Sequence, residues 1–557
     1  MSKKKASLVL TGCLFLACVS PILAENIVFP GYPLDISNDL SPDGNGNKVT
    51  INSGSIHNVY GSTGGLTALG NSVFIKGGTM ENVYGGFAPT AINNHVVVSG
   101  GKVIGNVVGG GSSFGSTTHN TVTLFGKPDL RQATLYGGLN LSMIPGDIRT
   151  GNTLNLHPPI TVKGLQNFEF LNFYLPATIK NGGTMLRVTD TAGLGVGAVV
   201  NVHPGAALLH VGDTITLIRG GTVSGSLTSD TLIGSGALMN YNFDLTMPGD
   251  QLRATVTDAE LRPQSIALSE GYITGMALLD QTGDRITAIS HGNRAFLDIS
   301  SSDLRYNTGS HVDVSGFSLL TGLSRHVRLT HGHLIASAFF EYGNGDYDTY
   351  NSFPHAASVQ GEGNVHHLGG GILGRVDFRT TGLYTEGSFR IGNVQNNFDS
   401  AGLGTNYNSS SSYRGIHFGG GTVQKITSKT SLDLYSKFTW TWQGSSSVTL
   451  SSGEWINFQT VNAQRLKIGG RFSNTVNNHL SVYYGAAWEQ GFDGLARATF
   501  GNYAFGTPSL RGSTGMGELG VTWKSARKFG LHSELGLQGY MGKREGATAT
   551  ISIGRTF

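Results

Sequence analysis

Residues 466–472 read Leu466-Lys467-Ile468-Gly469-Gly470-Arg471-Phe472, and alternate side chains differ in kind. In an extended strand, Leu466, Ile468 and Phe472 share one face, whereas Lys467 and Arg471 lie on the other. A strand of a soluble sandwich is usually five or six residues long and buries its apolar face against a second sheet. Strands from residue 295 onward run to ten or more residues, with one face charged or small and polar. This pattern predicts a transmembrane β-barrel with a lipid-facing outer surface and a wet interior.

The same alternation recurs twelve times up to residue 557, an even number as bacterial barrels require. Aromatic residues such as Phe339, Trp488 and Trp523 are expected in interfacial girdles near the strand ends. Short turns such as Asn477-Asn478 are expected on the periplasmic side, and long loops at 347–361, 396–412 and 492–508 on the outer side. The predicted strands are 295–302, 311–323, 332–343, 363–378, 382–394, 411–426, 430–444, 461–476, 479–492, 510–525, 530–542 and 545–557.

An extended helical pattern runs from Gln264 to Ile286, directly after Pro263. Its larger apolar residues recur at intervals of three and four, which is the helical period. Ala267, Gly271 and Gly275 form a stripe of small residues at intervals of four. Such a stripe lets a helix lie close against a wall, so we expect this helix to pack on protein rather than stand free in solvent.

The region before the helix is repetitive. A five-residue phrase that begins with Asn and alternates in polarity recurs every 24, 23, 26 and 32 residues, from Asn47 to Asn152. Two short strands and Gly-rich turns cannot bury their apolar side chains alone, so successive units must stack. The repeat therefore predicts a right-handed parallel β-helix with one repeat per coil, whose last coils and cap extend to about Val256.

A second phrase within each unit predicts side-chain ladders on this β-helix. Asn58, Asn82 and Asn106 are spaced by 24 residues both times, and Tyr60 and Tyr84 share that spacing. We expect an amide ladder and stacked rings that hold the coils in register. A glycan-binding aromatic strip is the alternative interpretation, although the equivalent position in the next coil is not aromatic.

The N-terminal segment 1–24 has the composition of a secretory signal peptide. Three lysines precede an apolar stretch that ends near Leu23, and Ala24 before Glu25 is the expected cleavage point. Both cysteines, Cys13 and Cys18, lie inside this segment. The mature chain would then have no disulfide, no thiolate nucleophile and no Cys-ligated metal.

The composition disfavours two function classes. The chain of 557 residues has 83 Gly and only 13% charged residues, unlike a typical soluble enzyme. The formal net charge of +3 gives no long-range field that would attract nucleic acid. We expect neither nucleic-acid binding nor a requirement for a cofactor or metal.

These features together resemble the monomeric autotransporters of type V secretion. The likeness covers essentially the whole chain and is most specific from Pro263-Gln264-Ser265-Ile266 onward; the stretches at 309–317 and 341–345 and the final Phe557 are similar to that barrel family. It implies an all-β chain with a passenger at 25–256, a linker and lumen helix at 257–294 and a barrel at 295–557. It also implies Sec-dependent export, insertion in outer-membrane lipid by the barrel assembly machinery and display of the passenger at the cell surface. Ile551, Ile553 and Phe557 match the assembly signal of such barrels.

The passenger carries no recognisable catalytic pattern. No Gly-x-Ser-x-Gly motif occurs between residues 25 and 256, and the histidines there lack metal-ligand spacing. We therefore expect a non-enzymatic passenger, an adhesin or structural binding module for an unidentified surface ligand; the alternative is a secreted hydrolase acting on polysaccharide. An ordinary porin is disfavoured by the helix. Some autotransporters release their passenger at an Asn-Asn pair on that helix, where this chain reads Asp280-Gln281, so we expect the passenger to stay attached.

Overall fold

The computed structural model describes residues 25–29, 35–36, 39–142, 144–288, 295–379, 381–525 and 530–555. Their contacts divide them into two compact units. The first contains the chain up to His203 with Val211–Ile233 and Asn242–Thr257, and the second contains Pro204–His210, Gly234–Tyr241 and the chain from Asp258 onward. The predicted cleavage residue Ala24, both cysteines and Phe557 lie outside the described residues.

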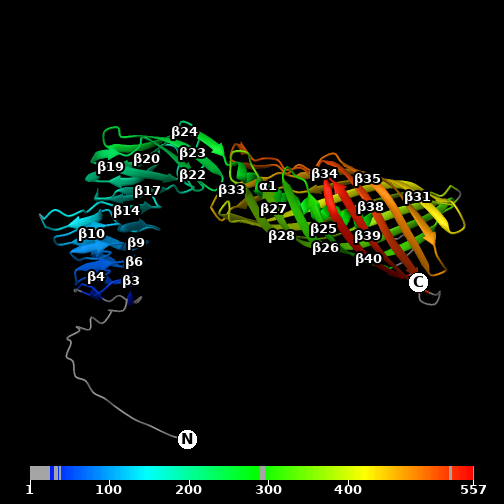
Figure 1. Cartoon of the computed structure of the whole chain (residues 1–557), viewed down its shortest axis with the longest axis horizontal. Coiled ribbons are helices and arrows are strands. Elements are labelled where there is room, and N and C mark those ends of the chain that lie inside the picture. The colour runs from blue at the N-terminus through cyan, green and yellow to red at the C-terminus, as the bar shows by residue number, and fades with distance from the viewer. Residues whose placement is uncertain are drawn as a thin grey trace, which may run out of the picture. The chain divides into compact units, whose positions relative to one another are not determined.

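The first unit is a parallel β-helix, as the repeat predicts (Figure 1). The Asn-initiated phrases form one face, in which neighbouring coils pair in parallel without a register shift. The second phrases form another face, and three short strands form a third. These strands are β3 (Lys48–Ile51), β6 (Ser72–Ile75), β9 (His95–Val98), β12 (Thr121–Leu124) and β14 (Thr153–Leu156); β4 (Ser55–Tyr60), β7 (Thr79–Tyr84), β10 (Lys102–Ser112) and β13 (Thr134–Asn140); and β5 (Thr67–Leu69), β8 (Thr90–Ile92) and β11 (Thr117–Thr118).

The core of the β-helix consists of side chains that stack from coil to coil. Val49, Val73, Val96, Val122 and Leu154 occupy equivalent places in successive coils and are fully buried. Burying each such side chain contributes about 1.5–3 kcal/mol, and only the neighbouring coils supply the apolar surroundings.

Parallel coiling ends in a six-stranded sheet. β15 (Ile160–Val162), β18 (Thr184–Val188) and β20 (Thr214–Arg219) pair in parallel. β20 then pairs antiparallel with β24 (Gln251–Leu261), and the sheet continues through β23 (Met239–Thr246) to β22 (Thr231–Ser235). β20 is the last parallel strand of this sheet. Its antiparallel pairing with β24 covers its free edge, so no further coil is needed there.

The second unit contains a closed barrel of twelve antiparallel strands, as predicted. The first and last strands pair antiparallel from Ala295 opposite Arg555 to Tyr306 opposite Arg544, which leaves the barrel without an open edge. Its strands are β25 (Ala295–Tyr306), β26 (His311–Arg328), β27 (Gly332–Asn351), β28 (Val359–Phe378), β29 (Leu383–Ser400), β30 (Thr405–Lys425), β31 (Thr430–Gln443), β34 (Val461–Thr475), β35 (Leu480–Gly491), β38 (Gly512–Lys524), β39 (Leu531–Gly542) and β40 (Arg544–Arg555).

The outer wall of the barrel is apolar, because alternate residues of each strand point away from the interior. Among the described residues, no helix is both long and apolar enough to span a membrane. The outward side chains with large exposed apolar surface include Phe340, Ile372, Phe418, Ile468, Trp488, Leu519, Trp523, Leu535, Ile551 and Ile553.

Two details of the sequence prediction were wrong. The stretches 347–361 and 396–412 are largely strand, since β27 extends to Asn351 and β29 to Ser400. Antiparallel backbone pairing continues beyond the apolar band because its hydrogen bonds do not require an apolar face. Phe339 is not in an outer girdle: it is buried and packs with Ile286, Phe296, Leu320 and Leu373.

Candidate functional site: the helix in the barrel lumen

A single long helix occupies the interior of the barrel (Figure 1). A 3-10 turn, η1 (Pro263–Ser265), leads into α1 (Ile266–Ile286), which confirms the predicted helix. Pro263 suits this position because the first turn of a helix has no partner for its backbone N–H groups. Every residue of α1 after Ile266 is buried, although the helix carries Glu270, Asp280, Asp284 and Arg285.

The predicted small-residue stripe lies close to bulky side chains of the wall. A Cβ added at Gly271 would lie 2.5 Å from a ring carbon of Phe398 and 2.8 Å from the hydroxyl of Tyr407. At Gly275 it would lie 2.9 Å from the side-chain amide of Gln443, and Ala267 is fully buried. That these three residues determine the seating of the helix stays a prediction, which substitution tests directly.

Replacing Gly271 by Ala tests whether packing or helix propensity dominates the stability of the helix at this position, because the two effects have opposite signs. Ala is the better helix former by about 1 kcal/mol, so local structure alone predicts stabilisation. We expect instead a loss of about 1–3 kcal/mol from overpacking against Phe398. The readout is the temperature at which the detergent-solubilised barrel loses its compact mobility on a gel. Gly283→Ala is the matched control, because its Cβ would meet only the end of the Arg390 side chain, at 3.1 Å, and equal effects of both variants would contradict the prediction.

Polar groups of the wall bind the N-terminal half of α1 through its backbone. The Tyr407 hydroxyl donates to the carbonyl of Leu268 at 2.9 Å, and the Asn396 side-chain amide donates to the carbonyl of Gly271. Glu270 accepts hydrogen bonds from Thr308 Oγ1, at 2.6 Å, and from Asn351. These contacts fix the helix along its axis, since each one pairs a particular turn of α1 with a particular strand.

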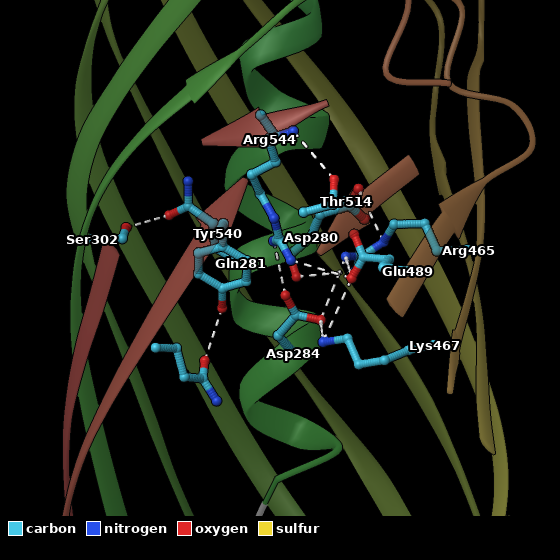
Figure 2. Close-up of polar contacts among 12 residues, drawn as sticks. Asp280, Gln281, Asp284, Ser302, Arg465, Lys467, Glu489, Thr514, Tyr540 and Arg544 are labelled. Atoms are coloured by element: carbon cyan, nitrogen blue, oxygen red, sulfur yellow. Dashed lines mark hydrogen bonds and ion pairs between the residues drawn. The ribbon is translucent and has the colours of Figure 1, made fainter. Parts of the chain in front are cut away.

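The C-terminal half of α1 carries a buried ion network, shown in Figure 2. Asp284 accepts from Lys467 Nζ at 3.0 Å, from Arg544 Nη1 at 2.8 Å and from Arg465 Nη1 at 3.4 Å. Glu489 on β35 lies 3.2 Å from both Arg465 and Arg544. With Asp280, 3.4 Å from Arg465, the network balances three cations with three carboxylates. The balance matters because an unpaired charge at this depth would be strongly destabilising.

Further polar contacts attach the same half of the helix to β25 and β29. Arg285 binds Asp298 through two hydrogen bonds of 2.9 and 2.7 Å. Gln281 accepts from Ser302 Oγ at 2.6 Å, and Arg390 donates to the carbonyl of Leu279 at 2.9 Å.

The alternating charged residues of β34 predicted that one face of this strand lines the wet barrel interior. The sequence did not predict which residues form the ion network. Its members come from positions 280 to 544, and only barrel closure brings Arg544 at the start of β40 next to Arg465 on β34. The spacing of Asp280 and Asp284, four residues apart on a helix, was the one local signal of a charged face.

The ladders of the β-helix form the second group of predicted residues. Asn82 donates to Asn58 at 2.8 Å and Asn106 to Asn82 at 3.0 Å. The rings of Tyr60 and Tyr84 stack 4.9 Å apart at an angle of 9°. In the next coil, Val108 occupies the register position of Tyr84, so the tyrosine stack ends there as the sequence indicated.

A longer ring stack, which the sequence pattern did not indicate, lies along the face formed by the Asn-initiated strands. His157, in the turn after β14, stacks on Tyr174 of β17 (Phe170–Tyr174) at 4.1 Å, and Tyr174 stacks on His203 of β19 (Thr191–His203) at 4.4 Å. Phe125 meets His157 edge-to-face at 5.6 Å. The histidines looked scattered because coil lengths vary here, so they share no sequence spacing. Among the described residues, no group of three or more His, Cys, Asp or Glu is arranged to hold a metal ion.

The histidine stack should make the β-helix sensitive to mild acid. Burial lowers the pKa of His157, the charge of His203 lowers it further, and burial also lowers the pKa of His203. Below the ordinary histidine pKa of about 6.5 the unfolded chain therefore binds more protons than the folded chain, so stability is full above that pH and falls below it. We expect protease resistance of the displayed β-helix to decrease from pH 7 to pH 5. The dependence should weaken in His157→Phe/His203→Phe but not in the exposed control His57→Phe, and a flat wild-type profile would refute the prediction.

Comparison with known proteins identifies the barrel. Residues 298–536 match the family model described as autotransporter beta-domain. The barrel is an autotransporter β-domain. The C-terminal barrel is accordingly an outer-membrane translocator domain.

Solved structures similar to this chain include three translocator units. The transport unit of AIDA-I from Escherichia coli is 16% identical, covers 54% of this chain and 100% of its own, and gives a TM-score of 0.41. The translocator domain of NalP from Neisseria meningitidis is 16% identical over 52% of this chain and 99% of its own, with a TM-score of 0.40. The β-domain of Bordetella BrkA is 15% identical over 48% and 100%, with a TM-score of 0.38. None of the curated proteins compared matches the chain.

Proposed function

We propose that this autotransporter displays residues 25–256 as an attached, non-enzymatic passenger that serves as an adhesin or structural binding module. Export through the Sec translocon, cleavage after Ala24 and insertion by the barrel assembly machinery complete the proposal. The observation that carries it is that several polar side chains of the passenger bond to its own turns and neighbouring coils.

The carboxylates illustrate this use. Asp147 accepts the backbone N–H groups of Arg149 and Thr150, both at 3.0 Å, and thereby closes a turn. Glu169 accepts the N–H of Gly151 at 2.6 Å and so joins two coils. One Asn ladder, which includes Asn58, Asn82 and Asn106, is part-buried near the surface. The other, which includes Asn94 and Asn120, is buried in the core. Stacked coils that are bonded to one another form an extended surface, which suits a module that presents a binding site.

Display and attachment are tested on intact cells of a Gram-negative host that express the full chain. External protease should remove the N-terminal epitope and leave a barrel-sized C-terminal fragment whose gel mobility shifts on boiling. The culture medium should contain no free passenger, since we expect no cleavage at Asp280-Gln281. Survival of both ends until lysis would refute display, and a released passenger would refute attachment.

The binding role is tested with the same cells. Cells that display the chain should adhere to host or bacterial surfaces more than cells carrying an empty vector, and protease shaving should abolish the difference. Polysaccharides incubated with the displaying cells should keep their chain length. Shortened products would instead support the hydrolase alternative and overturn the adhesin proposal.

A further inference from the structure

A cationic groove lies on the passenger between the turn that follows β12 and strands β15, β18 and β20 of the six-stranded sheet. Its volume is about 820 Å³, and four of its lining residues are basic while one is acidic. Three prolines and Ile160 add rigid apolar surface. The lining residues that matter for the argument are Lys127, Asp129, Arg131, Pro158, Pro159, Arg187 and Arg219.

Two of the cations are held side by side by strand register. Arg187 on β18 lies directly opposite Arg219 on β20, and Thr161 on β15 lies opposite Arg187. Neighbouring strands are about 4.8 Å apart, so the two guanidinium groups start from closely spaced backbone positions. Both side chains are exposed, and neither forms an ion pair with any described residue. Like charges in directly opposed positions destabilise a sheet, which makes this pair a natural place for an added anion.

The acidic residue in the groove does not neutralise this pair. Asp129 receives two hydrogen bonds of 2.9 Å from Arg131, one on each carboxylate oxygen. Arg131 thereby holds the pKa of Asp129 at about 2. The Asp129 charge is thus engaged by its own neighbour, and Arg187, Arg219 and Lys127 remain available to a ligand.

Aromatic surface borders the groove. Phe125 directly precedes the lining residue Gly126, and its side chain is 56% exposed. His157 directly precedes Pro158 and continues the ring stack into Tyr174. Ring surfaces beside charged donors form an amphipathic strip, which suits a ligand with both C–H faces and anionic groups.

We propose that this groove binds an acidic polysaccharide, a sugar polymer that carries carboxylate or sulfate groups. Arg187 and Arg219 contact successive anionic groups, and the ring of Phe125 packs against a sugar face. The inference rests on the proposed adhesin function and names its ligand class. Duplex DNA fits less well, because the formal net charge of +3 gives the chain no long-range field that would attract it.

The test measures binding of the purified full chain, reconstituted in lipid nanodiscs, to immobilised heparin, polygalacturonate, neutral dextran and duplex DNA. We expect binding to heparin or polygalacturonate that weakens with salt, and little binding to dextran or DNA. Arg187→Glu/Arg219→Glu should weaken glycan binding by about tenfold or more, since two charge-assisted contacts become repulsive. Arg187→Lys/Arg219→Lys should retain part of the affinity, which separates charge loss from misfolding.

The matched control is Lys76→Glu/Lys180→Glu, an equal charge change at two exposed passenger lysines outside the groove. It should leave glycan binding within about twofold of wild type. Equal losses in both double variants, unchanged binding in the arginine variant, or equal affinity for DNA would overturn the groove assignment. If displaying cells adhere but neither acidic glycan binds, the groove assignment fails and the adhesin proposal stands; if the cells adhere to nothing, the proposed function itself fails.

Discussion

Replacing Asp284 by Ala should destabilise the barrel by about 3–5 kcal/mol and open its lumen to ions. Asp284 is the carboxylate of α1 that contacts Arg465, Lys467 and Arg544, so its removal leaves three cations facing two remaining carboxylates. Helix propensity cannot cause the loss, because Ala favours a helix more than Asp does. Two measurements check the result: the temperature of the heat-dependent mobility shift in detergent, and the conductance of single barrels in planar bilayers.

Asp313→Ala provides a matched control for that experiment. Asp313 also accepts two hydrogen bonds from an arginine, Arg305, both of 2.7 Å, but the two side chains are 36% and 46% exposed. An exposed pair contributes about 0–1 kcal/mol, so this variant should differ little from wild type. Adding Lys467→Met to Asp284→Ala should recover part of the lost stability, because it restores charge balance. Indistinguishable Asp284 and Asp313 variants would show that the buried network does not hold the helix.

Replacing Asn94 by Ala should disrupt the passenger more than any surface substitution. Asn94 is 1% exposed, and its side chain accepts from the backbone and side chain of Asn71 and donates to Asn120 Oδ1 and to the carbonyl of Ala68. Each buried polar group left without a partner costs about 1–3 kcal/mol. Since several groups lose their partner together, we expect a loss above about 3 kcal/mol. Faster proteolysis of the passenger on intact cells is the readout.

Asn82→Ala is the control from the outer ladder. Asn82 also bonds to Asn residues of both neighbouring coils, at 2.8 and 3.0 Å, but it is only partly buried, so water replaces its bonds. We expect a loss of about 0.5–1.5 kcal/mol and a small change in protease sensitivity. A larger effect at Asn82 than at Asn94 would mean that the outer ladder, not the inner one, sets coil register.

The inner ladder shows where sequence reasoning reached its limit on the β-helix. The Asn that opens each phrase was visible at positions 47, 71, 94, 120 and 152, and the phrase correctly predicted a strand in each coil. An Asn before a strand suggests an exposed turn residue, whereas all five side chains are buried and bond to a neighbouring coil. Burial of these amides depends on the coil above and the coil below, which no single repeat contains.

The sequence by itself determined the period of each element. Alternation with a period of two over ten or more residues specified twelve lipid-facing strands, a repeat near 24 residues specified stacked coils, and spacing of three and four specified α1 between them. These are local properties, because a side chain's face follows from its own backbone geometry. Only the tertiary structure decided that Asp284 meets Arg544 and that Arg187 meets Arg219. These contacts depend on barrel closure and coil stacking. Both bring together residues whose positions in the sequence follow no repeat.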